Sequence, residues 1–336
     1  MSSYIIPKGT EVLVTGATGF TGSVLTRKLV ERGIKVRAIA RESSDLSMLS
    51  DLDIEWFRGD VFDPEVVGKA VKGVSYIFHV AAAYRDPGIT DKDYYNVHVV
   101  STRELATAAV ENPGFKRFVH VSTVGVHGHI ENPPADEKAP FKPGDIYQET
   151  KAEAELWMHQ FAGEHRLEYT VIRPAAIYGP GDRRLLKVFR MAIKPFFILL
   201  GKQKCHYHLI HVEDLTEAMI LAAVHPDAKS EVFICGNPES VPLEEMGKMI
   251  ADGIGKKHTL IRLPVWPFFL AGDICEAVCR PFGLKPPIYR RRVAFFTKNR
   301  SFDTRKLRDK LGYECKYSNS EGLKLTAEWY KKHGWL

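Results

Sequence analysis

The sequence predicts an α/β fold, in which a doubly wound parallel sheet is covered by helices on both faces and followed by a smaller C-terminal region. Short, nearly continuous apolar runs alternate with segments of helical periodicity along the first half of the chain. A glycine-rich turn joins the first apolar run to the first helical segment. The 336 residues, 45% hydrophobic and 26% charged, suffice for one large core with a smaller appended part.

The glycine-rich turn organises the N-terminal part. An apolar strand at 12–14 leads into Gly16, Gly19 and Gly22, spaced G-x-x-G-x-x-G, and residues 24–30 then have helical periodicity. Glycines let a pyrophosphate approach the backbone, and the N–H groups of a helix N-terminus donate hydrogen bonds to it, so the stretch is typical of a dinucleotide site. A second strand at 35–40 favours this Rossmann-type interpretation over a chance cluster of turn glycines.

The alternation then continues in order. We expect strands over 54–57, 75–80, 116–122 and 168–173, and helices over 64–71, 92–111 and 146–164. Beyond Gly179 the rhythm loosens into short helices, a strand near 232–234 and aromatic-rich segments. We therefore expect a dinucleotide-binding domain over 1–180 and a mainly substrate-binding region over 181–336, with some segments returning to the sheet. The substrate should lie between the two parts, at the carboxyl edge of the sheet.

Composition argues against several classes of protein. The net charge of +6 is only mildly basic and no base-reading module accompanies it, so we expect no nucleic-acid partner. Five scattered cysteines without a signal peptide predict reduced thiols in the cytoplasm. No window supplies an uncharged transmembrane span. The basic run 290–292 is either a solvated turn or a weak peripheral contact with anionic lipid.

Tyr147 and Lys151 carry the strongest chemical signal. Their i, i+4 spacing on the expected helix 146–164 puts the phenol and the ammonium on one face, about a turn apart. A nearby ammonium favours the phenolate and lowers the tyrosine pKa, which suits a general acid/base. The same spacing also occurs in ordinary exposed helices. Its position after a dinucleotide-binding half, one strand on from residues 122–123, favours the catalytic interpretation.

Further stretches complete a recognisable set of motifs, at 15–22, 59–61, 79–82, 96, 121–123, 147–151, 173–174, 178–180, 211–214, 302–307 and 311–313. Together they resemble the extended short-chain dehydrogenase/reductase superfamily, that is, the NAD-dependent epimerases and dehydratases, over nearly the whole chain. Residues 41–45, residues 81–85 and the apolar C-terminal segments look most similar to the branch of dihydroflavonol reductases and 3β-hydroxysteroid dehydrogenases.

The resemblance implies a role for each matching residue. Tyr147 would be the acid/base, Lys151 its pKa-lowering and ribose-binding partner, and Thr123 the hydroxyl that hydrogen-bonds the substrate oxygen. Asn96 would be either a helix anchor or a site residue. The implied cofactor-binding residues, besides Tyr147 and Lys151, are Gly16, Thr18, Gly19, Phe20, Thr21, Gly22, Asp60, Val61, Ala81, Ala82, Ser122, Pro174 and Tyr178.

The end of the second strand predicts the type of nicotinamide cofactor. An Asp or Glu there binds a ribose 2′-hydroxyl, whereas a cation binds a 2′-phosphate. Here the strand ends at Arg41, with Arg37 four residues earlier, and a guanidinium pairs well with phosphate. We therefore predict NADP(H), with both arginines as candidate binding residues. NAD(H) stays open because Glu42 stands one position later.

The substrate is predicted from the C-terminal half. Members of the superfamily that act on nucleotide sugars usually carry a diphosphate-binding Arg where this chain has Tyr207. Lys202, Lys204 or Arg183 could replace it. The aromatic-rich segments 195–200 and 263–270 suit a bulky apolar ligand instead. The candidate substrate residues are Tyr84, Thr123, Tyr207 and Trp266.

We therefore predict an NADP(H)-dependent oxidoreductase that interconverts an alcohol and a ketone on a ring substrate such as a steroid, triterpenoid or flavonoid. A nucleotide-sugar epimerase/dehydratase with tightly bound NAD(P) is the alternative, and a non-catalytic dinucleotide sensor a third. The long helices predict a homodimer by resemblance. No metal is expected, because His206 and His208 would face one side of a strand and Cys205 and His211 the other.

Overall fold

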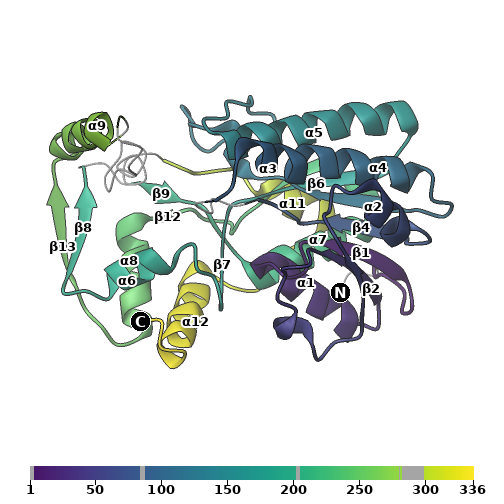
Figure 1. Ribbon diagram of the computed structural model, residues 1–336. Helices are drawn as coiled ribbons and strands as arrows, with labels where there is room; N and C mark the ends of the chain where they lie inside the picture. Colours follow the sequence, from purple (N-terminus) through teal and green to yellow (C-terminus); the bar gives the residue numbers. More distant parts are fainter. Residues whose placement is uncertain (1–3, 84–87, 202–204, 280, 282–298) are drawn as a thin grey trace.

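A parallel seven-stranded sheet forms the centre of the computed structural model, which describes residues 4–83, 88–201, 205–279, 281 and 299–336. Its strand order is β11-β6-β5-β4-β1-β2-β3 (Figure 1). From β1 the sheet extends to β2 and β3 on one side and to β4, β5, β6 and β11 on the other. This change of direction at β1 is typical of doubly wound folds and confirms the predicted fold class. The strands are β1 Glu11–Thr15, β2 Lys35–Ala40, β3 Ile54–Arg58, β4 Tyr76–His79, β5 Arg117–Val121, β6 Tyr169–Pro174 and β11 Glu231–Cys235.

Helices cover both faces of this sheet because successive strand residues point to opposite sides. Val12 and Val14 of β1 join one apolar core, and Leu13 joins the other. The first core is closed by α1 Phe20–Glu31, α7 Val212–Val224 and α11 Arg305–Leu311. The second is closed by α2 Pro64–Val71, α4 Ser101–Val110 and α5 Ile146–His165. In Figure 1, α3, α4 and α5 lie above the sheet and α1 lies below it.

The helix expected over 92–111 is interrupted. It consists of α3 Asp91–Tyr95, a π-helical turn Asn96–Val100 and α4. Thr90 starts α3 with a capping box to Asp93. A π turn holds one residue more than an α turn and is frequent at functional sites. Asn96, which the resemblance left between two roles, opens this turn.

The C-terminal elements build a third core beside the sheet (Figure 1). Three strand pairs belong to this part, β7 Ala176–Tyr178 with β10 Leu209–His211, β9 His206–Tyr207 with β12 Val241–Pro242, and β8 Phe196–Leu200 with β13 Thr259–Leu263. Its helices are α6 Leu186–Ala192, α8 Leu243–Gly253, α9 Trp266–Cys279 and α12 Asn319–Lys332. Short 3₁₀ turns lie at Ser47–Leu49, Val124–His127 and Pro226–Ala228.

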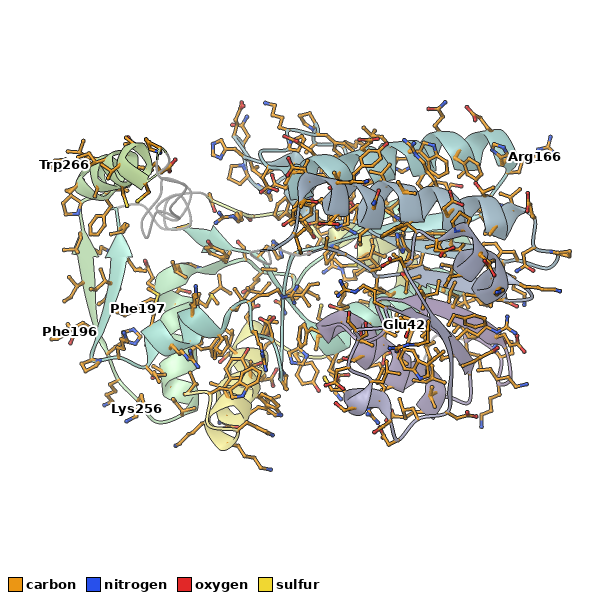
Figure 2. All side chains as sticks on the ribbon, viewed as in Figure 1. Glu42, Arg166, Phe196, Phe197, Lys256 and Trp266 are labelled. Carbon is orange, nitrogen blue, oxygen red and sulfur yellow. The ribbon has the colours of Figure 1, made fainter. Side chains whose placement is uncertain are left out.

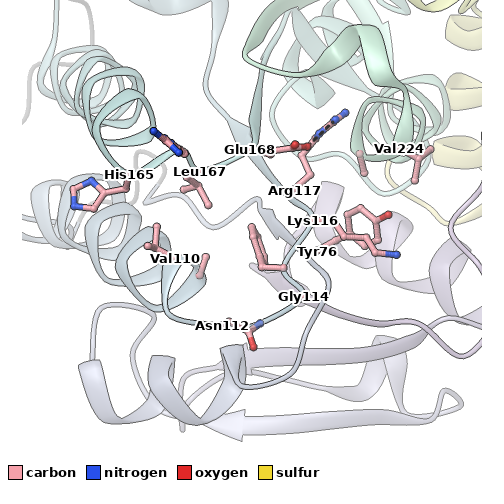
Figure 3. Close-up of a pocket in the computed structure, with 14 residues that line it drawn as sticks. Tyr76, Val110, Asn112, Gly114, Lys116, Arg117, His165, Leu167, Glu168 and Val224 are labelled. Atoms are coloured by element: carbon pink, nitrogen blue, oxygen red, sulfur yellow. Dashed lines mark hydrogen bonds and ion pairs between the residues drawn. The ribbon is translucent and has the colours of Figure 1, made fainter.

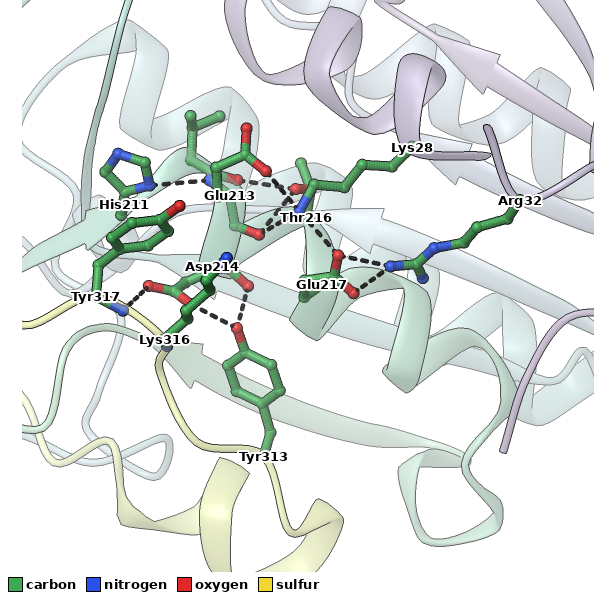
Figure 4. A network of polar contacts seen from close by, with 11 residues as sticks. Lys28, Arg32, His211, Glu213, Asp214, Thr216, Glu217, Tyr313, Lys316 and Tyr317 are labelled. Carbon is green, nitrogen blue, oxygen red and sulfur yellow. Dashed lines mark hydrogen bonds and ion pairs between the residues drawn. The ribbon is translucent and has the colours of Figure 1, made fainter. Parts of the chain in front are cut away.

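A polar network fastens the C-terminal segment to α7 and α1 (Figure 4). The buried carboxylate of Asp214 accepts hydrogen bonds from the Tyr313 hydroxyl at 3.0 Å and from the backbone N–H groups of 316–317. On the other side of α7, Glu217 pairs with Lys28 of α1 at 2.9 Å. The motif residues Asp214 and Tyr313 therefore act as anchors of the fold. Within the described residues, no helix is long and apolar enough to cross a bilayer.

Candidate active site

The turn between β1 and α1 leaves no room for larger residues. Gly16 has a φ of +73°, and a Cβ there would stand 2.8 Å from the Cα of Ala81. A Cβ on Gly22 would overlap the carbonyl oxygen of Gly16. Helix α1 begins after Gly19, which has no side chain to cap it, and its first turn carries no acidic residue. This geometry fits the pyrophosphate of a dinucleotide.

Around that turn, Thr18 and Gly19 keep exposed surface, whereas Thr21 is buried. The guanidinium of Arg184 lies over the ring of Phe20, 5.2 Å from its centroid. Arg184 was not predicted from the sequence, because 164 positions separate it from Phe20 and only the fold brings them together.

Because the central strands are parallel, the residues that follow them meet at one edge. Asp60 and Val61 follow β3, the pair Ala81–Ala82 follows β4, Thr123 follows β5 and Pro174 ends β6. The Ala81 N–H donates to the Thr15 hydroxyl at the end of β1, at 3.2 Å. The predicted cofactor residues 60–61, 81–82 and 174 therefore share the carboxyl edge with the glycine turn.

Two guanidinium groups stand at the ends of β2 and β3. Arg41 is exposed and directly follows β2. Arg58 ends β3, paired in register with Ala40, and its Nε lies 3.6 Å from the Glu42 carboxylate, labelled in Figure 2. The buried Nη1 of Arg58 has no hydrogen-bond partner among the described residues. The Glu42 carboxylate is therefore close to the Arg58 guanidinium, and the Nη1 donor of Arg58 has no partner among the described residues. Both features fit a phosphate ligand.

The expectation that Arg37 assists at this end was wrong. Its guanidinium pairs with Glu11 and Glu55 at 2.8 Å each and donates to the carbonyl of Lys72. Glu11 opens β1, so these contacts lie toward the amino edge of the sheet. Four residues of strand span about 13 Å, and Arg37 is held by these contacts away from the end at which Arg41 stands.

Helix α5 brings Tyr147 and Lys151 to the carboxyl edge. Asp145 caps the helix by accepting from the Gln148 N–H at 2.9 Å. The buried ammonium of Lys151 donates to the carbonyl oxygen of Val121, the last residue of β5, at 2.9 Å. Burial lowers the pKa of Lys151 to about 8, although the charge of Glu155 opposes this. The predicted pair therefore stands beside the end of β5.

Thr123 lies next to the first turn of α5. Its Oγ1 accepts from the Gly125 N–H at 3.0 Å, which starts a 3₁₀ turn. A Cβ on Gly125 would lie 3.2 Å from that Oγ1 and 3.3 Å from Cγ of Gln148, the neighbour of Tyr147. The small Gly125 therefore allows the candidate hydroxyl and helix α5 to approach each other.

The expectation that the Ser122 side chain contacts the cofactor was also wrong, because its hydroxyl is engaged by a buried side chain of α5. It donates to the fully buried Glu155 of α5 at 2.5 Å. Glu155 also accepts from Arg173 of β6, at 2.9 Å from Nε and 2.5 Å from Nη2. Burial raises the pKa of Glu155, but hydrogen bonds from His159, Arg173 and Ser122 outweigh it and bring this pKa to about 2. This ion pair was not predicted, since its partners come from separate elements.

The expectation that Tyr178 binds the cofactor was wrong as well. Its ring is buried in the C-terminal core, 5.3 Å from the ring of His211, and its hydroxyl fills the space beside Gly322 of α12. Burial raises the pKa of Tyr178. Tyr178 is thus a packing residue, and its side chain does not face the cofactor edge.

The substrate candidates are widely separated. Tyr207 is buried, and its hydroxyl accepts from Arg300 Nη1 at 2.6 Å. A cation therefore does stand beside Tyr207, supplied from 93 positions later in the chain. Trp266 is 67% exposed on α9, at the opposite end of the molecule from Arg166 (Figure 2). Its helical spacing was correct, but the shared face points outward rather than toward a cleft. Tyr84, Lys202, Lys204 and the basic run 290–292 lie outside the described residues.

The histidines near Cys205 each have a separate partner. His206 Nδ1 lies 3.2 Å from the Ser240 hydroxyl, His208 Nε2 contacts the Asn237 carbonyl, and His211 Nδ1 accepts from the Glu213 N–H at 3.3 Å. No group of three or more metal-ligating side chains occurs in the part of the chain that the structure describes.

A surface hollow lies at the other edge of the sheet (Figure 3). Its lining includes Tyr76, Lys116 and Glu168, which stand at or just before the starts of β4, β5 and β6. Its Arg117 donates to the carbonyls of Ala222 and His225. None of the predicted site residues lines this hollow.

Comparisons with known proteins agree with this geometry. A family model described as "NAD dependent epimerase/dehydratase family" matches residues 12–236, more than half of the chain. A Mycobacterium tuberculosis protein named 3 beta-hydroxysteroid dehydrogenase/Delta 5-->4-isomerase is 29% identical over 337 residues, which cover 95% of this chain and 90% of that protein.

Two further similarities extend over nearly the whole chain. An Arabidopsis thaliana protein named 3beta-hydroxysteroid-dehydrogenase/decarboxylase isoform 2 is 29% identical over 353 residues and 94% of this chain, although the match spans only 61% of that longer protein. The crystal structure of gox2253 is similar with a TM-score of 0.81 and 28% identity, and the match covers 98% of this chain and 100% of that one.

Proposed function

This chain belongs to the NAD dependent epimerase/dehydratase family, and we propose on that basis that it interconverts an alcohol and a ketone on a bulky apolar ring substrate with NADP(H). It is an NAD(P)-dependent enzyme of the extended short-chain dehydrogenase/reductase type. The observation that carries the proposal is the buried Lys151, which is fixed by a hydrogen bond to the end of β5, two residues before Thr123 and one helical turn after Tyr147.

The proposed chemistry divides between cofactor and protein. A bound nicotinamide supplies or accepts the hydride at the carbinol carbon. Tyr147 exchanges the proton of the substrate oxygen, so oxidation of the alcohol leaves a ketone and a protonated phenol. Thr123 hydrogen-bonds the same oxygen and orients it. The charge of Lys151 favours the phenolate form of Tyr147, and residues 16–22 hold the pyrophosphate.

NADP(H) is proposed from the ends of β2 and β3. Arg41 would pair with the 2′-phosphate, while Arg58 offers the buried Nη1 that no described residue engages. Glu42, the residue that would favour NAD(H), is opposed by the nearby Arg58 guanidinium. The balance of charge at this end therefore supports the phosphorylated cofactor.

A steroid-like ring is proposed because two similar proteins are named for 3β-hydroxysteroid oxidation. Such a ring alcohol needs a hydroxyl-binding pair and an apolar surround. Thr123 and Tyr147 supply the first, and we propose that the C-terminal part, whose own core is apolar, supplies the second.

A nucleotide-sugar epimerase is the second candidate, and Arg300 favours it. Its guanidinium stands at Tyr207, the position where a diphosphate-binding arginine was expected. The two candidates differ in their cofactor balance, because an epimerase regenerates its nicotinamide in each cycle.

Turnover assays separate the candidates. The purified protein is mixed with NADP⁺ or NADPH and a panel of 3-hydroxysteroids, 3-ketosteroids and flavonoid ketones, and separately with UDP-sugars. Net change in absorbance at 340 nm with a steroid supports the proposal. Epimerised sugar without net cofactor change contradicts it and supports the second candidate.

We also propose a homodimer that pairs α4 and α5. The outer face of α5 carries the exposed Leu156 beside Trp157, and Arg103 of α4 stands over that indole at 5.7 Å. Leu156 and Trp157 line one surface hollow together with Phe141 and Pro143, and a group of apolar side chains at a surface suits coverage by another chain. Sedimentation of Leu156→Glu tests it, with a shift from dimer to monomer expected and an unchanged dimer contradicting it.

A further inference from the structure

His98 joins the loop after β4 to the catalytic helix. The imidazole is fully buried in the π-helical turn Asn96–Val100. Its Nε2 accepts from the Ala83 backbone N–H at 3.1 Å, and its Nδ1 lies 2.8 Å from the Thr150 hydroxyl. Ala83 follows Ala81, which packs against Gly16 of the glycine turn, and Thr150 adjoins Lys151 on α5.

We propose that His98 is a positioning residue, which couples the cofactor-side loop 81–83 to the first turns of α5 and thereby orients Tyr147. The proposal rests on the acid/base role proposed above for Tyr147. His98 would act on the reaction only through Tyr147 and the helix that carries it.

The directions of the hydrogen bonds define the tautomer of His98. A backbone N–H only donates, so Nε2 must be unprotonated and the ring proton must sit on Nδ1. Nδ1–H then donates to the Thr150 hydroxyl, and that hydroxyl donates to the Ile146 carbonyl at 2.8 Å. The chain of bonds runs from Ala83 to Ile146, the first residue of α5 and the neighbour of Tyr147.

The surroundings keep this ring neutral. Burial, together with the charge of Lys151, lowers the pKa of His98 to about 2. The charge of His120 lowers this pKa further. The acceptor at Nε2 is therefore retained at every working pH, which a rigid connection requires.

His98 also contacts Tyr147 directly. The two rings meet edge to face, with centroids 5.3 Å apart and planes at 85°. Tyr94 completes the aromatic group at 6.4 Å from Tyr147 and 5.9 Å from His98. The phenol ring is thus held on one side by the same imidazole that anchors its helix.

A second buried histidine holds the same loop without reaching α5. His79 Nδ1 pairs with the Thr15 hydroxyl at 2.8 Å, and that hydroxyl accepts from the Ala81 N–H. His79 Nε2 lies 3.1 Å from the Ser101 hydroxyl of α4. His79 therefore anchors the loop to β1 and α4, and His98 alone of the two extends to α5.

The test compares His98→Leu with Thr150→Val and the double variant. Each single change removes the link to α5, so we expect kcat to fall at least tenfold in each, with KM for the steroid changed less than threefold. Since both act on one connection, the double variant should lose no more than the worse single variant. Thr150→Ser, which keeps the hydroxyl, should restore kcat to within about threefold of wild type. Multiplicative losses in the double variant, or an unchanged kcat, would overturn the proposal.

A readout independent of turnover completes the test. Hydrogen exchange of the protein alone is followed at the Ala83 amide and over residues 149–153. His98→Leu should speed exchange at both places, whereas Thr150→Val should speed it over 149–153. Unchanged exchange over 149–153 in both variants overturns the coupling. If the two variants exchange as expected but the wild-type protein oxidises no steroid, the proposed function fails while the coupling still stands.

Discussion

The ammonium of Lys151 donates a 2.9 Å hydrogen bond to the carbonyl oxygen of Val121, the last residue of β5. This bond fixes α5 against the carboxyl edge of the sheet, two residues before Thr123. It also places a charge in a buried site, one helical turn after Tyr147. The candidate acid/base and its tuning charge are therefore anchored to the same strand end as the candidate substrate-binding hydroxyl.

The charge of Lys151 should set the alkaline limit of activity. Because burial lowers its pKa from 10.5 to about 8, the ammonium is present below pH 8 and is lost above it. We expect kcat/KM to decline with a midpoint near pH 8. In Lys151→Arg the guanidinium stays charged, so the midpoint of this decline in kcat/KM should rise by more than one pH unit, even if the rate is lower. A decline with the same midpoint in both proteins would contradict the assignment.

Replacing Glu155 by Gln should destabilise the fold, since Arg173 keeps a buried charge without its partner. The pKa of Glu155 is lowered from 4.5 to about 2, so its stabilisation is full above pH 4.5 and is lost as pH falls toward 2. That shift corresponds to about 3 kcal/mol at pH 7.

Urea unfolding at pH 7 and pH 3 checks this. The free energy of unfolding of Glu155→Gln should lie about 3 kcal/mol below wild type at pH 7, with a smaller difference at pH 3. The control is Glu153→Gln. Glu153 lies on the same helix as Glu155 and forms an exposed ion pair with Arg103 of α4, so the free energy of unfolding of this variant should stay within about 0.5 kcal/mol of wild type. An equal loss at both pH values would disprove the linkage.

Arg41→Asp should shift cofactor preference from NADP(H) toward NAD(H). Loss of the cation and gain of a carboxylate both disfavour a 2′-phosphate, so the ratio of the Kd values for NADPH and NADH should change by at least a hundredfold. Titration of each cofactor by fluorescence measures it directly. Arg37→Gln is the matched control, because that arginine is engaged by Glu11 and Glu55. Selectivity that is unaltered in Arg41→Asp, or equally altered in Arg37→Gln, would sink the phosphate assignment.

Gly22→Ala should abolish cofactor binding or folding, because a Cβ there overlaps the Gly16 carbonyl. The control is Gly68→Ala in α2, where a Cβ meets nothing within 4 Å. Alanine favours a helix over glycine by up to about 1 kcal/mol, so this variant should be as stable as wild type or more so. Thermal unfolding with and without NADPH distinguishes the two, and a Gly22→Ala protein with normal binding would argue against the tight turn.

The elements that local patterns encode could be predicted from the sequence. The apolar runs gave the strands of the central sheet within one or two residues, and helix α5 begins and ends almost where its periodicity suggested. Tyr147 and Lys151 were recognisable because their relationship is local, one turn of one helix. The π turn at Asn96–Val100 was missed, since apolar spacing does not distinguish it from a continuous α-helix.

What depends on long-range contact could not be predicted. Arg300 beside Tyr207 and Glu155 beside Arg173 are joined only by the fold. Trp266 shows a related limit, because helical spacing identifies a face but not whether that face is buried. Arg37 failed for a different reason. A strand separates residues by about 3.3 Å each, so a position four residues back belongs to the other half of the strand.

The most direct test of the account is turnover by Tyr147→Phe. This variant removes one hydroxyl and keeps the ring that packs on His98. Single-turnover oxidation of a 3β-hydroxysteroid is measured at 340 nm, and NADPH binding is measured by fluorescence. The oxidation rate should be at least a thousandfold below wild type, and the Kd for NADPH should be unchanged. A variant that binds NADPH normally and still oxidises the steroid at near the wild-type rate would contradict the role of Tyr147.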